Sequence, residues 1–203
     1  MKEHISELSP DEFQKTFPIE LKDVISDYSE WYEEEKDKIL SVLSENGIAR
    51  INHIGSTAIP NIKAKPIVDI LLEIDDTCHI KKLVEALKEI DFGTEILYRK
   101  EEPFELLMSK GMTVNGFGQR VFLLHIRYLG DWNELYFRDY LLDNPDIAEE
   151  YSNLKIQILK DINDGRIERM PNGQPNGYSA AKYAFVDDIS HKAKLAYKNR
   201  YKI

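Results

Sequence analysis

The segment from residue 50 to 74 constrains the fold most, because it holds two short extended runs separated by a Gly-Ser turn and a polar stretch with two lysines. Apolar and β-branched residues predict strands over residues 48–54 and 67–74. In the second run, Asp69 interrupts an otherwise apolar sequence, PIVDILL, over residues 66–72. A carboxylate in a buried strand needs a partner or a metal to remain charged. Functional chemistry is therefore expected around Asp69.

The rest of the chain surrounds this pair of strands with further regular elements. Ser9, Pro10 and Glu12 resemble a helix start, and Gly47 resembles a left-handed helix end. Apolar spacing predicts helices over residues 28–45, 80–90, 132–142, 145–162 and 178–198, the second capped near Thr77, with residues 33–38 as a solvated face. Further strands are expected over residues 94–99, 104–109 and 120–128, with a turn at residues 101–103 and a Gly-rich connection at residues 111–118.

This order of elements predicts an α/β (α+β) fold with a mixed sheet flanked by helices and a helical C-terminal half. We expect a single domain over residues 1–203. It divides into an N-terminal extension (1–20), a sheet-containing core (21–130) and a helical part (131–203).

Composition excludes several classes of protein. The net charge of −9 argues against general nucleic-acid binding. A single cysteine, Cys78, excludes an intrachain disulfide and a cysteine-based zinc site. No apolar run approaches the roughly 18 residues of a membrane span, and the polar N-terminus shows no targeting segment. We therefore expect a cytoplasmic protein that does not bind membranes.

Two groups of residues in the central segment are candidates for chemistry. After the first strand, Gly55 and Ser56 can turn backbone N–H groups and a hydroxyl toward an anion, although a turn without a function is the commoner use of such a pair. In the second strand, Asp69 and Glu73 share a face with Leu71 between them. They are candidates for a catalytic or metal-binding pair. In the alternative, Glu73 is exposed at the strand end and Asp69 pairs with Lys65 or an arginine.

Other candidates lie in or near strands and in the C-terminal helices. His53 and His125 stand among apolar residues, where a histidine is either a ligand or a satisfied core residue. The strand pattern places His125 and Arg127 on one face. The remaining candidates for binding an anionic group, each of which could instead form a surface salt bridge, are Lys63, Lys65, Arg138 and Lys182. No Walker loop, dinucleotide fingerprint, Gly-x-Ser-x-Gly elbow or His-Glu-x-x-His motif is present.

Several motifs together resemble the GrpB family of small bacterial proteins. The most specific are HIGSTAIP at residues 53–60 and AKPIVDIL at residues 64–71. Further agreement comes from YSEWY at 28–32, LHI at 124–126, FRDYL at 137–141 with Pro145 and Tyr151, and GYSAAKYAFV at 177–186. The resemblance covers about residues 20 to 190.

This resemblance implies a nucleotidyltransferase-like fold, in which a Gly-Ser turn holds a nucleotide and an Asp-x-Asp/Glu strand holds a metal. Gly55 and Ser56 match the turn, and Asp69 matches the first carboxylate. Leu71 departs from the pattern, because it stands where an active transferase has its second carboxylate. His125 occupies the strand that would supply the third, and Glu73 would need a register adjustment to substitute.

Two main hypotheses follow from the sequence. In the first, favoured by Leu71, the protein binds a nucleotide or a phosphorylated small molecule without catalysis. The residues of this binding site would be His53, Gly55, Ser56, Lys65, His125, Arg127, Arg138 and Lys182. In the second, it is a Mg²⁺-dependent nucleotidyl- or phosphoryl-transferase with Asp69 and Glu73 on the metal and Ser56 and Lys65 on the phosphates. The candidate catalytic residues of this enzyme are Asp69, Glu73 and His125. A third hypothesis, a structural or regulatory partner of another protein, has no sequence feature of its own.

Overall fold

The computed structural model of the chain describes residues 5–43, 47–99, 104–167, 177–198 and 200–202. Within them, the principal sheet has the strand order β2-β4-β7-β6-β5. Its strands are β2 (Ile48–Ile54), β4 (Val68–Ile74), β5 (Thr94–Arg99), β6 (Glu105–Thr113) and β7 (Gly116–Tyr128). Strands β4 and β7 are parallel, and the other neighbouring pairs are antiparallel. A short antiparallel pair, β1 (Lys22–Asp23) and β3 (Lys63–Ala64), lies beside this sheet. The mixed sheet predicted from the sequence is confirmed.

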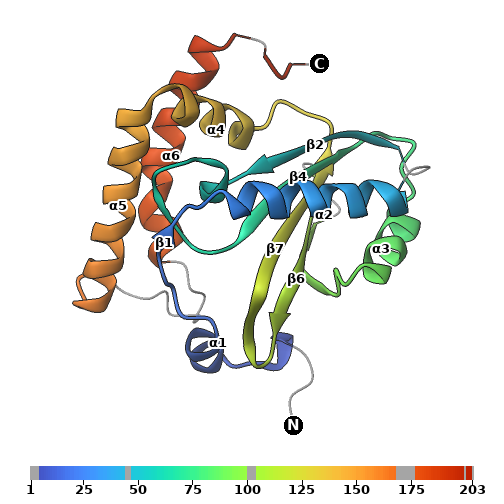
Figure 1. The fold of residues 1–203 in the computed structure, drawn as a ribbon, viewed down its shortest axis with the longest axis horizontal. Coiled ribbons are helices and arrows are strands. Elements are labelled where there is room, and N and C mark those ends of the chain that lie inside the picture. The colour runs from blue at the N-terminus through green and yellow to red at the C-terminus, as the bar shows by residue number, and fades with distance from the viewer. Residues whose placement is uncertain (1–4, 44–46, 100–103, 168–176, 199, 203) are drawn as a thin grey trace.

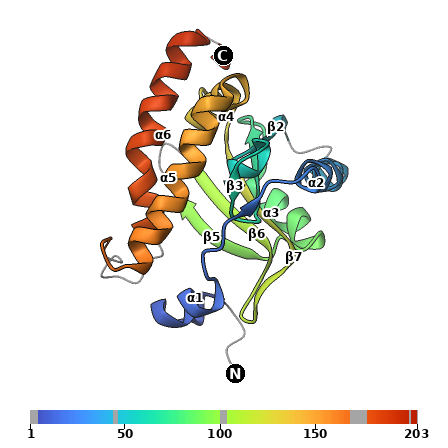
Figure 2. The same cartoon turned by 60° about the vertical axis from the view of Figure 1, so that its left-hand side comes forward.

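Helices cover both faces of the principal sheet (Figure 1). They are α1 (Pro10–Thr16), α2 (Asp27–Leu43), α3 (Ile80–Glu89), α4 (Asn133–Asp143), α5 (Pro145–Asn163) and α6 (Gly177–Ala196), with 3₁₀ turns η1 (Ile5–Glu7) and η2 (Ser56–Ala58). Figure 2 shows α2 and α3 on one side of the sheet and α5 and α6 side by side on the other. Within the described part of the chain, no helix is long and apolar enough to cross a lipid bilayer. The helical C-terminal half expected from the sequence is present.

Strand β4 divides the core between these two helical layers. Successive side chains of a strand point to opposite faces. Val68, Ile70, Leu72 and Ile74 are buried in the main hydrophobic cluster with α2 and α3. Leu71 points the other way and packs with Ile54 and Leu135, the latter on α4. Asp69 and Glu73 therefore face the layer formed by the C-terminal helices.

The Gly-rich connection expected between two strands is a β-hairpin. Strands β6 and β7 extend through it, so that Thr113 pairs with Gly116 across a two-residue loop. Gly111 has φ +81°, and a Cβ atom there would lie 2.0 Å from the carbonyl oxygen of Arg120. Glycine at this position therefore lets the register of the hairpin shift beside it.

Other local predictions have mixed outcomes. The N-terminal capping box is confirmed, since the Ser9 side chain and the backbone N–H of Glu12 meet as expected. The N-cap of helix α3 is His79 and not Thr77. The backbone N–H and the hydroxyl of Thr77 both donate to the carboxylate of Asp75. Glu35, expected on a solvated face, is buried and pairs with Lys110. Gly47 has the predicted positive φ of 59°, while the expected turn at residues 101–103 lies outside the described residues.

Candidate functional site

A cavity of about 420 Å³ lies between the sheet face that carries Asp69 and the C-terminal helices. Its sheet side comes from the turn after β2, the approach to β4 and one residue of β7. Its other side comes from α4, α5 and α6. The residues that line it are Gly55, Ser56, Lys65, Ile67, Asp69, Leu123, Asn133, Glu134, Phe137, Tyr151, Tyr178, Lys182, Tyr183, Val186, Asp187 and Ser190.

The Gly-Ser turn forms one wall of this cavity, and the backbone requires glycine there. Gly55 has φ +72°, and a Cβ atom would lie 2.5 Å from Oδ2 of Asp69. The turn is held against the approach to β4 by Thr57, whose buried hydroxyl donates to the carbonyl oxygen of Ile67 (3.0 Å). The structure thus brings Ser56 and Asp69 to the same cavity, as the sequence predicted.

His53 and Arg138 support the turn from behind. The ring of His53 stacks on Tyr32 (4.8 Å between centroids), and its Nε2 lies 3.1 Å from Oγ1 of Thr57. Burial lowers the pKa of His53 to about 4, so the ring is neutral near pH 7. Arg138 donates to the carbonyl oxygen of His53 and pairs with Asp139. Neither predicted residue is among the described residues that line the cavity.

Two side chains of β7 were also expected at the site. Nε2 of His125 lies 3.0 Å from Oδ1 of Asp69, so the two form a pair at the sheet face. Arg127 lies between Glu105 and Glu134, at 2.8 Å from each. Arg127 is therefore not one of the described residues that line the cavity, but it binds Glu134, which is.

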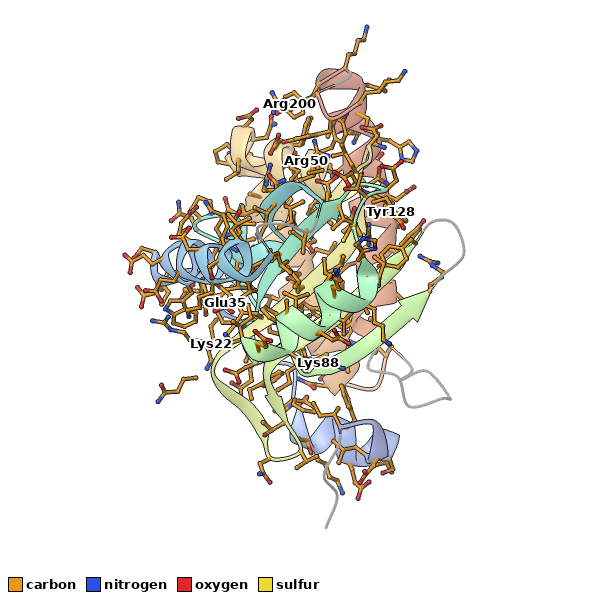
Figure 3. All side chains as sticks on the ribbon, turned by 90° about the vertical axis from the view of Figure 1, so that its right-hand side faces the viewer. Lys22, Glu35, Arg50, Lys88, Tyr128 and Arg200 are labelled. Carbon is orange, nitrogen blue, oxygen red and sulfur yellow. The ribbon has the colours of Figure 1, made fainter. Side chains whose placement is uncertain are left out.

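Glu73, expected as a second metal ligand, forms a buried ion pair instead. Its side chain is 0% exposed and accepts hydrogen bonds from Arg50 (2.5 and 2.6 Å) and from the backbone N–H of Gly130 (3.1 Å). Figure 3 shows Arg50 near the end of the molecule that also carries Arg200. In the described part of the chain, no three His, Cys, Asp or Glu side chains gather as they would around a metal ion. The described donors do not fit a Mg²⁺ site built from Asp69 and Glu73.

Three lysines lie in the wall of this cavity or directly behind it. Lys65 and Lys182 line it, and both amines lie over the Tyr178 ring, at 5.9 and 4.6 Å from its centroid. Lys155, on α5, is 1% exposed, and its Nζ lies 3.2 Å from Oγ of Ser56. Burial, with a smaller effect of Lys182, lowers the pKa of Lys155 to about 7. Burial and the charge of Lys65 lower the pKa of Lys182 to about 8, against an opposite effect of Asp69.

The charges around the cavity are unevenly matched. Each acidic side chain that lines it pairs with a basic side chain: Asp69 with His125, Glu134 with Arg127, and Asp187 with His191. By contrast, no described carboxylate lies within 4 Å of the amine of Lys65, Lys155 or Lys182. Lys63 is different, because it pairs with Asp23 at 2.7 Å. The cavity therefore offers amines without ion-pair partners, which suits an anionic group.

Sequence reasoning missed Lys155 as a member of the site. It lies on the buried face of α5, where Ala148, Tyr151, Ser152 and Ile158 are also buried. Their spacing of three and four residues is the helical pattern of an inward face. A lysine at an inward position of an amphipathic helix was the available signal.

Comparison with known proteins finds one matching family and several related bacterial proteins. The sequence profile of the GrpB protein family matches residues 18–192. Glutamate-rich protein GrpB of Alkalihalophilus pseudofirmus is 33% identical over 161 residues, or 78% of this chain and 86% of that protein. UPF0157 protein YqkA of Bacillus subtilis is 33% identical over 134 residues, which cover 64% of this chain and 37% of YqkA.

A solved structure agrees with these matches. The crystal structure of conserved protein GrpB from Enterococcus faecalis superposes with a TM-score of 0.68 at 27% sequence identity. The superposition covers 88% of this chain and 99% of that one. The chain belongs to the GrpB protein family.

Proposed function

We propose that the cavity binds a nucleotide or another phosphorylated small molecule. One observation carries this proposal: Lys65 and Lys182 line the cavity and Lys155 contacts its Ser56, and none of the three amines has a described carboxylate in ion-pair distance. Burial lowers the pKa values of Lys155 and Lys182, and the positive charge of a neighbouring lysine lowers each of them further. A phosphate group would supply the missing negative charge and accept their hydrogen bonds.

The size and lining of the cavity support a ligand larger than inorganic phosphate. About 420 Å³ lies within the roughly 300–1,000 Å³ range of small-molecule sites. Beyond the lysines, the wall includes the side chains of Phe137, Tyr183 and Val186. These surfaces would contact the organic part of the ligand, while Ser56, Lys65 and Lys182 would hold its phosphates.

The surroundings of Asp69 favour binding over metal-dependent transfer. Leu71, at the position where the nucleotidyltransferase-like pattern needs a carboxylate, is 0% exposed and packs in an apolar cluster. Glu73 is held by Arg50. We therefore propose that recognition in this cavity does not depend on a protein-held Mg²⁺ ion.

Calorimetric titration with ATP, GTP and CTP, with and without Mg²⁺, tests this function. We expect at least one nucleotide to bind with an affinity that changes little with Mg²⁺. The Ser56→Ala variant should bind it more weakly, while Ser29→Ala, an exposed serine on α2, should bind normally.

Two results would contradict the proposal. One is the absence of binding to every nucleotide and to simpler phosphate esters. The other is an affinity that rises at least about tenfold with Mg²⁺ and vanishes in Asp69→Asn, which would favour the metal-dependent transferase.

A further inference from the structure

Ser56 and Lys155 form a pair whose layout differs from that of a simple phosphate contact. Ser56 lines the cavity, whereas Lys155 lies behind Ser56 with 1% of its surface exposed. Nζ of Lys155 lies 3.2 Å from Oγ of Ser56 and also donates to the carbonyl oxygen of Lys63. The buried amine therefore meets the ligand space through the serine hydroxyl.

The surroundings of Lys155 allow both the charged and the neutral form of its amine near neutral pH. Burial, with the positive charge of Lys182 on α6, lowers the pKa of Lys155 to about 7. On its own helix, the amine lies over the ring of Tyr151, at 4.4 Å from the centroid, and burial raises the pKa of that phenol to about 12. The other charged residues of the cavity wall are Lys65, Asp69, Glu134 and Asp187. In the structure, Nζ donates to Oγ of Ser56. Once the amine has lost a proton, its lone pair can instead accept the hydroxyl proton of Ser56.

We propose that Ser56 is a nucleophile toward the phosphorus of a bound phosphoryl donor and that Lys155 is its general base. This inference rests on the proposed function only for the class of donor. In the step, the Oγ–P bond forms and the bond from phosphorus to the leaving oxygen breaks, with its electron pair departing on that oxygen. The hydroxyl proton passes to Nζ of Lys155, and Lys65 and Lys182 stand where they can stabilise the phosphoryl oxygens.

A fluorophosphonate probe tests the nucleophile without knowledge of the natural ligand. Attack by Oγ on its phosphorus releases fluoride and leaves a stable phosphonyl ester, which peptide mass spectrometry locates. We expect the label on Ser56, and its rate should rise with pH to a plateau with an apparent pKa near 7.

Variants at Lys155 separate the base from a merely structural lysine. Lys155→Arg keeps a positive donor but cannot act as a base near neutral pH, and Lys155→Met removes the charge. We expect both to label at least about 100-fold more slowly than the wild type. Lys160→Met, an exposed lysine of the same helix, is the control and should label normally.

Circular dichroism would show which Lys155 variants are folded, and Ser56→Ala provides a small substitution that removes the labelled atom. Label on other residues only, or equal rates in wild type and a folded Lys155 variant, would overturn the inference. A wild-type protein that binds nucleotide but does not label with the probe would overturn the inference and leave the proposed function standing. Labelling of Ser56 without any nucleotide binding would instead support the nucleophile and contradict the proposed ligand.

Discussion

At the scale of single residues, two buried ionisable groups, Glu73 and Lys155, differ in whether they have an ion-pair partner. Glu73 is fully buried, and Arg50 and the backbone of Gly130 satisfy it. Lys155 is almost as fully buried, and its amine contacts a hydroxyl, a carbonyl and the Tyr151 ring but no described carboxylate. A satisfied ion pair contributes to structure, whereas a buried amine without a counter-charge is costly to maintain. The first therefore belongs to the core and the second to the site.

Removing one member of the Arg50–Glu73 pair should destabilise the protein strongly. We expect Arg50→Met to lower the free energy of unfolding by about 3–5 kcal/mol, because it leaves the buried Glu73 carboxylate without its partner. The change is measured by urea denaturation. Lys192→Met, which breaks an exposed ion pair on α6, is the control and should leave the free energy of unfolding nearly unchanged. Equal effects of the two substitutions would show that the Arg50 pair is not a buried structural contact.

The lowered pKa values predict that ligand binding is coupled to protonation. Without ligand, Lys155 and Lys182 lose protons near pH 7 and 8, below the ordinary lysine value of 10.5. Between each lowered pKa and 10.5, the unfolded chain binds more protons than the folded chain. The contribution of these lysines to the free energy of unfolding therefore rises with pH in that window. A bound phosphate reverses the shift of Lys182, which lines the cavity, by favouring its charged form, whereas Lys155 meets the ligand space only through Ser56. Affinity should therefore fall as pH rises from 7 to 9.

Calorimetry in buffers of different ionisation enthalpy measures this coupling. Near pH 8, we expect binding to take up protons from the buffer in the wild type and to take up fewer in Lys182→Met. A binding enthalpy that is the same in every buffer at pH 8 would contradict the proposed contact between phosphate and these amines.

At the scale of elements, the hairpin of β6 and β7 depends on one backbone conformation. Gly111→Ala should lower the free energy of unfolding by at least about 2 kcal/mol, because it adds strain at positive φ and a clash with Arg120. Gly93→Ala is the matched control, since nothing lies within 4 Å of its added Cβ. The comparison is made by thermal and urea denaturation. A Gly111→Ala protein as stable as Gly93→Ala would mean that the hairpin adopts another conformation.

Most strands and helices were predictable because their signals are local. Strand β2 has the predicted bounds, and α5 begins at Pro145 as expected. The hairpin was not predicted, because its glycines read as a loop when the partner strand is unknown. The contacts of Glu73 and Lys155 were also out of reach, because each partner lies far along the chain. The sequence located the Gly55–Ser56 turn and Asp69, whereas only the fold shows which cations reach them.

At the scale of the whole molecule, the cavity lies where two halves of the chain meet. The sheet supplies Ser56, Lys65 and Asp69, and the C-terminal helices supply Lys182 and the aromatic wall. The buried hydroxyl of Ser152, on α5, accepts from the backbone N–H of Lys63 (2.8 Å) and ties the two halves together beside the site. A ligand in the cavity would contact both halves, so binding should stabilise their packing.

The affinity for the nucleotide that the wild type binds, ATP in the first instance, measured by calorimetry in the wild type and two variants, tests the central claim most directly. The Lys65→Met/Lys182→Met double variant removes both amines that line the cavity, whereas Lys192→Met removes an exposed amine from the same helix as Lys182. Because hydrogen bonds to charged groups contribute about 1.5–3 kcal/mol each, we predict that the double variant binds at least about 100-fold more weakly. Lys192→Met should bind like the wild type. Equal affinity in all three proteins would contradict a phosphate site built on these lysines.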